Sequence, residues 1–150
     1  MRTDADETVA DLHRLFSGLI RLASRMRLRN AMHPNVRNLA QTDVWLLSHL
    51  AATGPARMSA LAEWQAVDPS TMTAQVKHLE RAGLARRHTD PTDRRASIVT
   101  LTKEGETVCD EIRRGASAFF ADLLSGWTPE QRRELIESMT RLSAALEEHL

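Results

Sequence analysis

The sequence has almost none of the features of a secreted or membrane-embedded chain. Its single cysteine, Cys109, excludes an intrachain disulfide and fits a reducing cytoplasm. No stretch approaches the roughly 18 consecutive apolar residues that a membrane span needs. The N-terminus is acidic and lacks the apolar segment of a signal peptide. We therefore expect a cytoplasmic protein with no membrane partner.

The motifs of catalysis are also missing. The six glycines are spread over expected turns and helix ends and form no phosphate-binding loop. No nucleophile-and-base signature is present. The six histidines lack the spacing of metal ligands and have no cysteine cluster beside them. We therefore expect neither an enzyme nor a bound metal or cofactor.

The net charge of zero argues weakly against a nucleic-acid partner, but the average hides a gradient. Residues 55–103 carry 8 basic and 5 acidic side chains, whereas residues 104–150 carry 5 and 10. The local field, not the net charge, governs encounter with phosphate. The middle of the chain can therefore still be a nucleic-acid-binding region.

The length of 150 residues indicates one domain. Apolar residues spaced by three and four predict one long helix over residues 5–29, interrupted at Pro34. The same spacing predicts a second helix over 42–53, which Gly54 and a following proline end.

Two short helices follow, separated by a tight turn. The first has Ser59 as its expected N-cap and ends near Gln65. The second begins strongly, because Asp68 can cap it and Pro69 can occupy its first position, where no donor is needed. Gly83 is a natural residue to follow its C-terminus. This pattern is that of a helix-turn-helix.

A β-hairpin and two long helices complete the chain. Short β-prone runs over 84–88 and 97–101 predict the hairpin. Thr102 is expected to cap a helix over about 103–125. Thr128, Pro129 and Gln131 form a capping box that begins the last helix.

The expected fold class is therefore mainly α with a small β-hairpin, in which a winged helix-turn-helix core over about 42–102 is flanked by long helices over about 5–40 and 103–150. Helices of about 24 residues are about 36 Å long, longer than so small a centre can cover. Their apolar stripes can fold back on the domain or pack against a second copy, and we favour the second copy. The expected dimerisation residues are Leu12, Phe16, Leu19, Phe119, Leu135, Met139, Leu142 and Leu146.

One face of the helix after Asp68 suits DNA. Met72, Val76 and Leu79 share a narrow arc and are expected to be buried. The opposite face is small, polar and basic, with no acidic residue before Glu80, and its hydroxyl, amide and amino groups can meet phosphates or base edges. Any solvated helix face is polar, but the hairpin beside this one favours DNA. The expected contacts are Ser70, Thr71, Thr73, Ala74, Gln75, Lys77 and His78.

The hairpin tip, "HTDPTDRRAS", carries two adjacent arginines. Asp90 and Pro91 are expected to build its turn. Arg94 and Arg95 on such a wing suit the narrow, negative minor groove or its phosphates. Asp93 can orient a neighbouring arginine by a charge-assisted hydrogen bond.

These motifs together resemble the winged-helix core of the MarR (multiple antibiotic resistance regulator) family. The resemblance is carried by "MSALAE", "PSTMT…LERAGL", "DPTDRR" and "LTKEG", and this core covers about a third of the chain. It implies an obligate homodimer whose terminal helices dimerise and whose two lobes bind a pseudo-palindromic operator. It also implies a transcription factor, most simply a repressor that a small molecule releases.

The resemblance assigns roles to single residues. Arg95 falls where the family's minor-groove arginine sits, with Asp93 as its buttress, and Ser70, Thr71 and Thr73 fall on recognition-helix positions. The chain departs from the family at Ala74, His78 and Thr92, where arginine is common, so base preference cannot be carried over.

The family's effectors are often small aromatic or phenolic anions bound between the dimerisation helices and the DNA-binding lobe. Simpler roles compete, since Trp45 can belong to the core and the arginines to a solvated helix. The candidate ligand-pocket residues are Arg21, Arg25, Met26, His33, Trp45 and His49.

Two alternatives remain open. The first is a winged-helix protein–protein interaction module without specific DNA binding, which would favour an apolar or acidic helix face and a wing without arginines. The second is a regulator that senses oxidation through Cys109. Glu106 and Asp110 beside this thiol would raise its pKa and lower its reactivity, so a structural cysteine is favoured.

Overall fold

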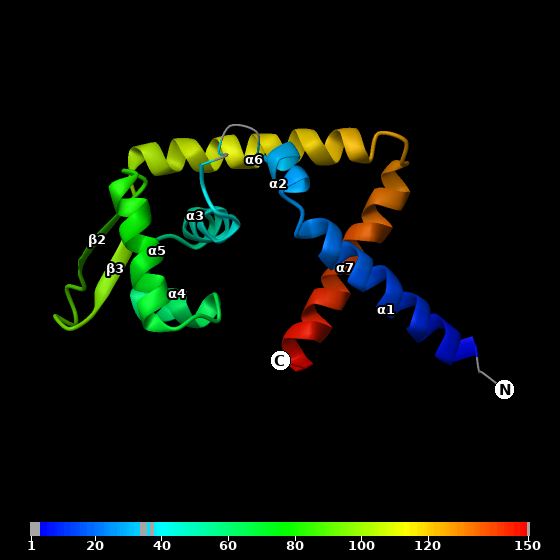
Figure 1. Cartoon of the computed structure of the whole chain (residues 1–150), viewed down its shortest axis with the longest axis horizontal. Coiled ribbons are helices and arrows are strands. Elements are labelled where there is room, and N and C mark those ends of the chain that lie inside the picture. The colour runs from blue at the N-terminus through cyan, green and yellow to red at the C-terminus, as the bar shows by residue number, and fades with distance from the viewer. Residues whose placement is uncertain (1–3, 34–35, 37, 150) are drawn as a thin grey trace. The chain divides into compact units, whose positions relative to one another are not determined.

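The structure is a computed structural model. It describes the backbone of residues 4–33, 36 and 38–149, and the side chains of these residues except 4–7, 26 and 27. The chain forms two compact units, Met1–Ala116 and Ser117–Leu150. In chain order, the elements (Figure 1) are α1 (Asp4–Ala23), α2 (Met26–Met32), α3 (Gln41–Thr53), β1 (Ala56–Arg57), α4 (Met58–Trp64), α5 (Pro69–Arg81), β2 (Ala85–Thr89), β3 (Ser97–Leu101), α6 (Lys103–Leu123) and α7 (Pro129–His149).

The expected fold class is confirmed, since helices dominate and the strands form one small antiparallel sheet in the order β1-β3-β2. The β2–β3 hairpin pairs Ala85 with Leu101 at one end and Thr89 with Ser97 at the other. The sequence did not predict β1, because a strand of two residues has no measurable alternation. Its Ala56 pairs with Val99. No helix among the described residues is long and apolar enough to cross a membrane.

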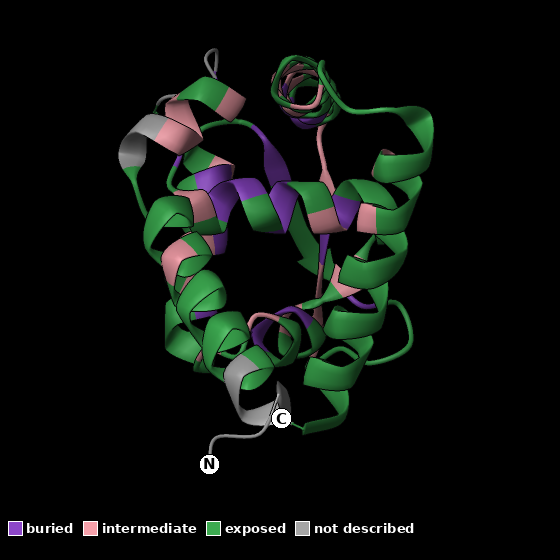
Figure 2. Cartoon of the chain, turned by 90° about the vertical axis from the view of Figure 1, so that its right-hand side faces the viewer, coloured by how far each residue is buried: buried purple, intermediate pink, exposed green. Residues whose placement is uncertain are grey.

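The core of the first unit lies between α3, α4, α5 and β3. Its largest fully buried side chains are Leu46, Leu47, Leu61, Met72, Leu79, Val76 and Val99. The three from α5 are those that the helical spacing predicted, and each contributes about 1.5–3 kcal/mol by leaving water. Figure 2 shows such buried residues in purple, whereas the helices leading to the N and C labels are almost wholly exposed.

The termini of α5 are also as predicted. The Asp68 carboxylate accepts the Thr71 N–H at 2.9 Å, and Pro69 follows at the first helical position. At the other end, Gly83 has a φ of 73°, in the left-handed region that glycine tolerates best. In α4, however, Ser59 is not the N-cap. That position belongs to Arg57, because the helix begins directly after strand β1, and Ser59 already lies inside it.

The prediction of a single helix over residues 5–29 is wrong. α1 ends at Ala23, Arg25 has an extended backbone (φ −77°, ψ 130°), and α2 begins at Met26. The Ser24 hydroxyl donates to the Ile20 carbonyl at 2.9 Å, a local bond that competes with the helical pattern and bends helices. Apolar spacing continues across the break, so periodicity alone could not locate it.

The expected N-caps of the last two helices, α6 and α7, are confirmed. Thr102 Oγ1 accepts the Gly105 N–H at 3.0 Å at the start of α6. The capping box before α7 is complete, because the Thr128 N–H donates to Gln131 Oε1 at 2.9 Å and the Gln131 N–H donates to Thr128 Oγ1 at 3.2 Å.

Gly105 occupies a place where no side chain fits. A Cβ there would collide with the Leu84 carbonyl oxygen, which the Thr102 N–H holds at 3.0 Å. We expect Gly105→Ala to lower the free energy of unfolding by about 1–3 kcal/mol, as overpacking does. Urea unfolding followed by circular dichroism measures this. Gly18→Ala is the control, since its Cβ would meet open space. An unchanged midpoint for Gly105→Ala would contradict the close approach.

Candidate nucleic-acid interface

The outward face of α5 carries the residues that the helical spacing placed there. Ser70, Thr71, Ala74, Lys77 and His78 are exposed, whereas Thr73 and Gln75 are half-buried. The face contains no acidic side chain of its own, although Asp68 lies at its beginning. Its free groups are therefore hydroxyls, a methyl group and basic side chains.

The hydroxyls at the beginning of α5 are bonded within the protein. The Ser70 hydroxyl donates to the Asp68 carboxylate, and the Thr71 hydroxyl donates to the other oxygen of the same carboxylate at 2.6 Å. The Thr73 hydroxyl donates to the Pro69 carbonyl at 2.7 Å. The bonds from Ser70 and Thr71 lower the pKa of Asp68 far below its ordinary value, first through the Ser70 hydroxyl and then through the Thr71 hydroxyl and N–H. The carboxylate is therefore ionised.

Gln75 and His78 face other elements of the lobe. Gln65 Nε2 donates to Gln75 Oε1 at 3.0 Å, which ties α5 to the end of α4. An adenine contact by Gln75 would require this bond to be exchanged. His78 Nε2 lies 3.6 Å from Oδ2 of the buried Asp43, an oxygen that also accepts the Ala40 N–H at 3.0 Å.

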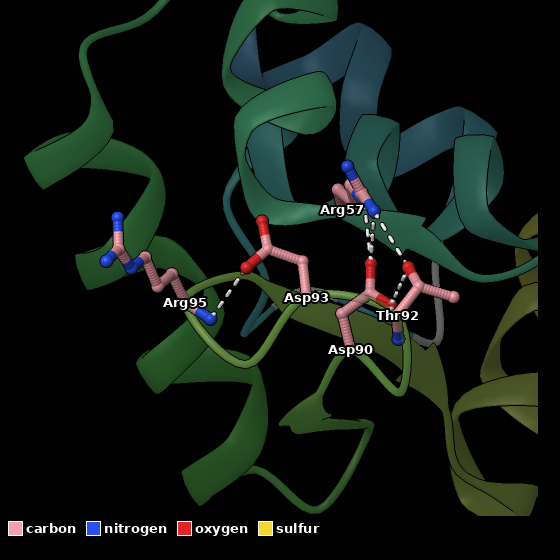
Figure 3. Close-up of polar contacts among 5 residues, drawn as sticks. All are labelled: Arg57, Asp90, Thr92, Asp93 and Arg95. Carbon is pink, nitrogen blue, oxygen red and sulfur yellow. Dashed lines mark hydrogen bonds and ion pairs between the residues drawn. The ribbon is translucent and has the colours of Figure 1, made fainter.

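The wing is anchored at its base by a buried carboxylate that the sequence did not reveal as a site residue. Asp90 is 3% exposed, and its Oδ2 accepts a hydrogen bond from Arg57 Nε at 2.7 Å (Figure 3). Arg57 Nη2 forms an ion pair with the same oxygen at 2.7 Å and donates to the Thr92 hydroxyl at 3.2 Å. Oδ1 of Asp90 accepts the Thr92 N–H at 2.8 Å and the Thr92 hydroxyl at 2.7 Å. An aspartate two residues before a threonine predicts the second pair of bonds, but no sequence signal points to Arg57.

These contacts set the charge state of Asp90. The Thr92 hydroxyl lowers its pKa most, followed by the Thr92 N–H and then Arg57, and the resulting value is about 2. The carboxylate therefore remains charged at neutral pH and holds Arg57 of strand β1 against the wing.

At the wing tip, Asp93 organises the backbone. Its Oδ1 accepts the Arg95 N–H at 3.0 Å, and its carbonyl accepts the Ala96 N–H at 2.9 Å. The expected orientation of an arginine by Asp93 thus acts through the main chain, and the Arg95 guanidinium points away from this carboxylate (Figure 3). The side chains of Arg94 and Arg95 are exposed.

A hollow of about 400 Å³ joins α5 to the wing. It is lined from α4 and α5 by Ser59 and Thr73, and from the hairpin by Arg87, Asp93 and Arg95. Two arginines and one aspartate therefore line one concave surface beside the exposed face of α5. Such a surface suits phosphate, which accepts charge-assisted hydrogen bonds from arginine.

The candidate ligand-pocket residues are divided between two cavities of the first unit. One, of about 480 Å³, is lined by Arg25, Arg29, Gln41 and Trp45 among others. The other, of about 590 Å³, includes His33 and Trp45. Trp45 does not belong to the core, since its side chain is 53% exposed and lines both cavities.

Of the remaining ligand-pocket candidates, His49 and Arg21 line neither of these two cavities, whereas His33 lines the larger one. His49 stacks on Trp64 with ring centroids 3.9 Å apart, and Arg21 is exposed. The Met26 side chain lies outside the described residues. His33 is buried, which lowers its pKa, and its Nδ1 has no hydrogen-bond partner in the described part of the chain.

Cys109 has the surroundings of a structural cysteine. It is buried, and its thiol donates to the Leu47 carbonyl at 3.4 Å. Burial raises the pKa of this thiol, and Asp110 and Glu106 raise it further. A protonated, buried thiol is a poor nucleophile, so the geometry does not favour an oxidation sensor at this position.

Comparisons with known proteins agree with this geometry. A model described as the MarR family matches residues 39–97. The HTH-type transcriptional regulator YxaD of Bacillus subtilis is 32% identical over 108 residues, which cover 72% of this chain and 76% of that protein. The HTH-type transcriptional repressor MdtR of the same organism is 27% identical over 143 residues, 95% of this chain and 90% of that one.

Solved structures extend the likeness over nearly the whole chain. The transcriptional regulator BldR from Sulfolobus solfataricus has a TM-score of 0.73 at 29% identity, covering 95% of this chain and 99% of that one. FabT of Streptococcus pneumoniae, solved in complex with DNA, has a TM-score of 0.73 at 20% identity, covering 98% and 100%. At 20% identity, the likeness to FabT shows a shared fold only.

The lowered pKa of Asp90 makes its contribution to stability depend on pH. That contribution is complete above the ordinary value of 3.8 and is lost as the pH falls toward about 2. We expect Asp90→Asn to be less stable than wild type near neutral pH, with the difference shrinking as the pH falls below about 4. Urea midpoints across this range measure it. Thr92→Val should raise the pKa of Asp90, as seen by carboxyl carbon NMR. A stability difference between wild type and Asp90→Asn that stays constant with pH would contradict the lowered pKa of Asp90.

Proposed function

The chain belongs to the MarR family of transcriptional regulators, and from this premise we propose that it binds double-stranded operator DNA as a homodimer and represses transcription until a small ligand releases it. The observation that carries the proposal is the continuous surface made by the exposed face of α5, the hollow with Arg87 and Arg95, and the wing tip. On this proposal α5 enters the major groove and the wing reaches the flanking minor groove.

Exposed apolar side chains support the homodimer. In α1 these include Leu12, Leu19 (59% exposed) and Phe16, and in α7 Met139 (56%), Leu142 and Leu146. Phe119 and Leu135, also expected at the interface, are half-buried within the second unit. Monomeric proteins rarely leave so many large apolar side chains in contact with water, and a second copy offers the same faces in return. A dimer would also supply two lobes for a pseudo-palindromic operator.

Repression and ligand release are the finer parts of the proposal. Repression is supported by MdtR, which is named a transcriptional repressor. Ligand release is supported by the cavity in which Arg25 and Arg29 lie near an exposed indole, that of Trp45. Guanidinium groups bind carboxylates and phenolates, and an indole stacks on an aromatic ring, so an aromatic anion suits this lining.

A winged-helix protein–protein interaction module is the second candidate. Among the described residues, the feature that favours it is the stacked pair formed by the half-buried His49 and the exposed Trp64. The outward face of α5 argues against it, because this face has neither a large apolar side chain nor an acidic one. Salt dependence separates the two functions, since phosphate contacts weaken steeply as salt rises.

We expect tight binding to the DNA that flanks the protein's own gene, measured by fluorescence anisotropy with excess random DNA. Arg95→Ala should weaken binding about tenfold, the usual cost of one groove contact. Arg133→Ala is the control, because this exposed arginine pairs with Glu130 within α7 and belongs to neither α5 nor the wing. Affinity should fall steeply with salt.

The same assay tests the rest of the proposal. If Arg95→Ala and Arg133→Ala behave alike, the wing assignment is wrong. If the protein binds no fragment of the genome more tightly than random DNA, the interaction module is favoured. Aromatic carboxylates and phenols should release the bound DNA, and Trp45→Ala should abolish that release. A panel of such compounds without effect removes ligand release from the proposal.

We expect the protein to sediment at twice its chain mass of 16.8 kDa. Met139→Asp should shift the population toward monomer, since it places a charge on an apolar face that a partner must cover. Glu137→Asp, on an exposed position of the same helix, should leave the dimer intact. Analytical ultracentrifugation distinguishes these results, and a monomeric wild type would refute the homodimer.

A further inference from the structure

The hydroxyls of Ser70 and Thr71 lie on the exposed face of α5, but their protons are used in bonds within the chain. Both donate to the Asp68 carboxylate, one to each oxygen, and the Thr71 bond is 2.6 Å long. A hydroxyl has one proton and two lone pairs. Once the proton is used, the side of the hydroxyl that faces outward can only accept a hydrogen bond.

The direction of these bonds follows from chemistry and needs no knowledge of hydrogen positions. An ionised carboxylate has no proton to donate, so each hydroxyl must be the donor. The same hydroxyls hold the pKa of Asp68 far below its ordinary value, and the carboxylate therefore remains ionised at neutral pH. Thr73 follows the same rule, since its hydroxyl donates to the Pro69 carbonyl at 2.7 Å.

We propose that Ser70 and Thr71 read the operator as hydrogen-bond acceptors and so select base pairs that present an amino group there, namely cytosine N4 or adenine N6. This inference rests on the proposed DNA-binding function and names the bases that the first turn of α5 favours. In the major groove, only these two amino groups donate, whereas guanine and thymine present acceptors at the corresponding edges.

The usual role of such hydroxyls, donation to phosphate, is unfavourable here. A phosphate offers only acceptors, so Ser70 or Thr71 would first have to break its bond to Asp68. The freed carboxylate would then lie beside the phosphate, and the two negative charges would repel each other. Lys77 and His78, further along the exposed face, can meet phosphate or guanine instead.

The bonds to Asp68 also make the two hydroxyls better acceptors. A hydroxyl that donates to a charged group is polarised, which strengthens the bond it accepts. Its rotation is already restricted, so less entropy is lost when a base arrives. Asp68 therefore acts as a positioning residue for the two hydroxyls, in addition to capping α5.

The first stage of the test finds the operator. Selection from a random DNA library by the wild-type dimer should enrich a half-site motif. Within it, each cytosine is replaced in turn by 2-pyrimidinone and each adenine by purine, which lack the amino group. We expect at least one replacement to weaken wild-type binding about 3–10-fold, the worth of one hydrogen bond. That loss should disappear in Ser70→Ala or Thr71→Val, which have no hydroxyl at the contact.

The second stage reverses the polarity. Asp68→Asn keeps a good helix cap, but its amide can accept through only one oxygen and donates through its nitrogen. At least one hydroxyl must then turn its proton outward. Selection with this variant should replace an amino-bearing base by guanine or thymine at the position found in the first stage. Arg133→Ala serves as the control, because it changes an exposed side chain of α7 and leaves α5 and Asp68 as they are.

The outcomes are distinguishable. If wild type enriches no motif, the proposed function fails. If a motif is enriched but tolerates every amino deletion, the inference is wrong and the function stands. The inference is also wrong if the loss persists in both Ser70→Ala and Thr71→Val. A motif unchanged in Asp68→Asn, with an unchanged melting temperature, would overturn the role of Asp68.

Discussion

The seating of α5 on the core is the constraint on which the rest of the lobe depends. Met72, Val76 and Leu79 are completely buried, so the helix cannot rotate about its axis without exposing at least one of them. A turn of one residue position, 100°, would carry Lys77 toward the core, where an unpaired charge costs several kcal/mol. The outward face is therefore decided by what the inward face must bury, and the polar groups offered to a partner follow from it.

The wing depends on a different kind of interaction. The hairpin has few buried side chains, and Asp90 takes their place as an anchor, since it bonds Arg57 on one oxygen and Thr92 on the other. Because both carboxylate oxygens are satisfied, the burial of this charge is compensated. The anchor ties the wing to strand β1, immediately before α4. The two halves of the candidate interface, α5 and the wing tip, are thereby fixed to the same lobe.

Local features of the fold could be predicted from the sequence, and non-local ones could not. The caps at Asp68, Thr102 and Thr128 involve partners within three residues, so residue types alone reveal them. The Arg57–Asp90 pair joins residues 33 apart, through a strand too short to show a pattern. In the site, periodicity could say which side chains face outward. It could not say where their protons point, because that depends on the carboxylate the hydroxyls happen to meet.

The first turn of α3 connects the two proposed activities of the lobe. Gln41 and Trp45 line the cavity that contains Arg25, and between them in the sequence stands the buried Asp43. Asp43 holds the Ala40 N–H and lies 3.6 Å from His78, on the exposed face of α5. A ligand held against Gln41 and Trp45 would thus press on the turn that faces α5. A ligand can shift the lobe only through differential contact with two arrangements of it, and this turn lies between the cavity and α5.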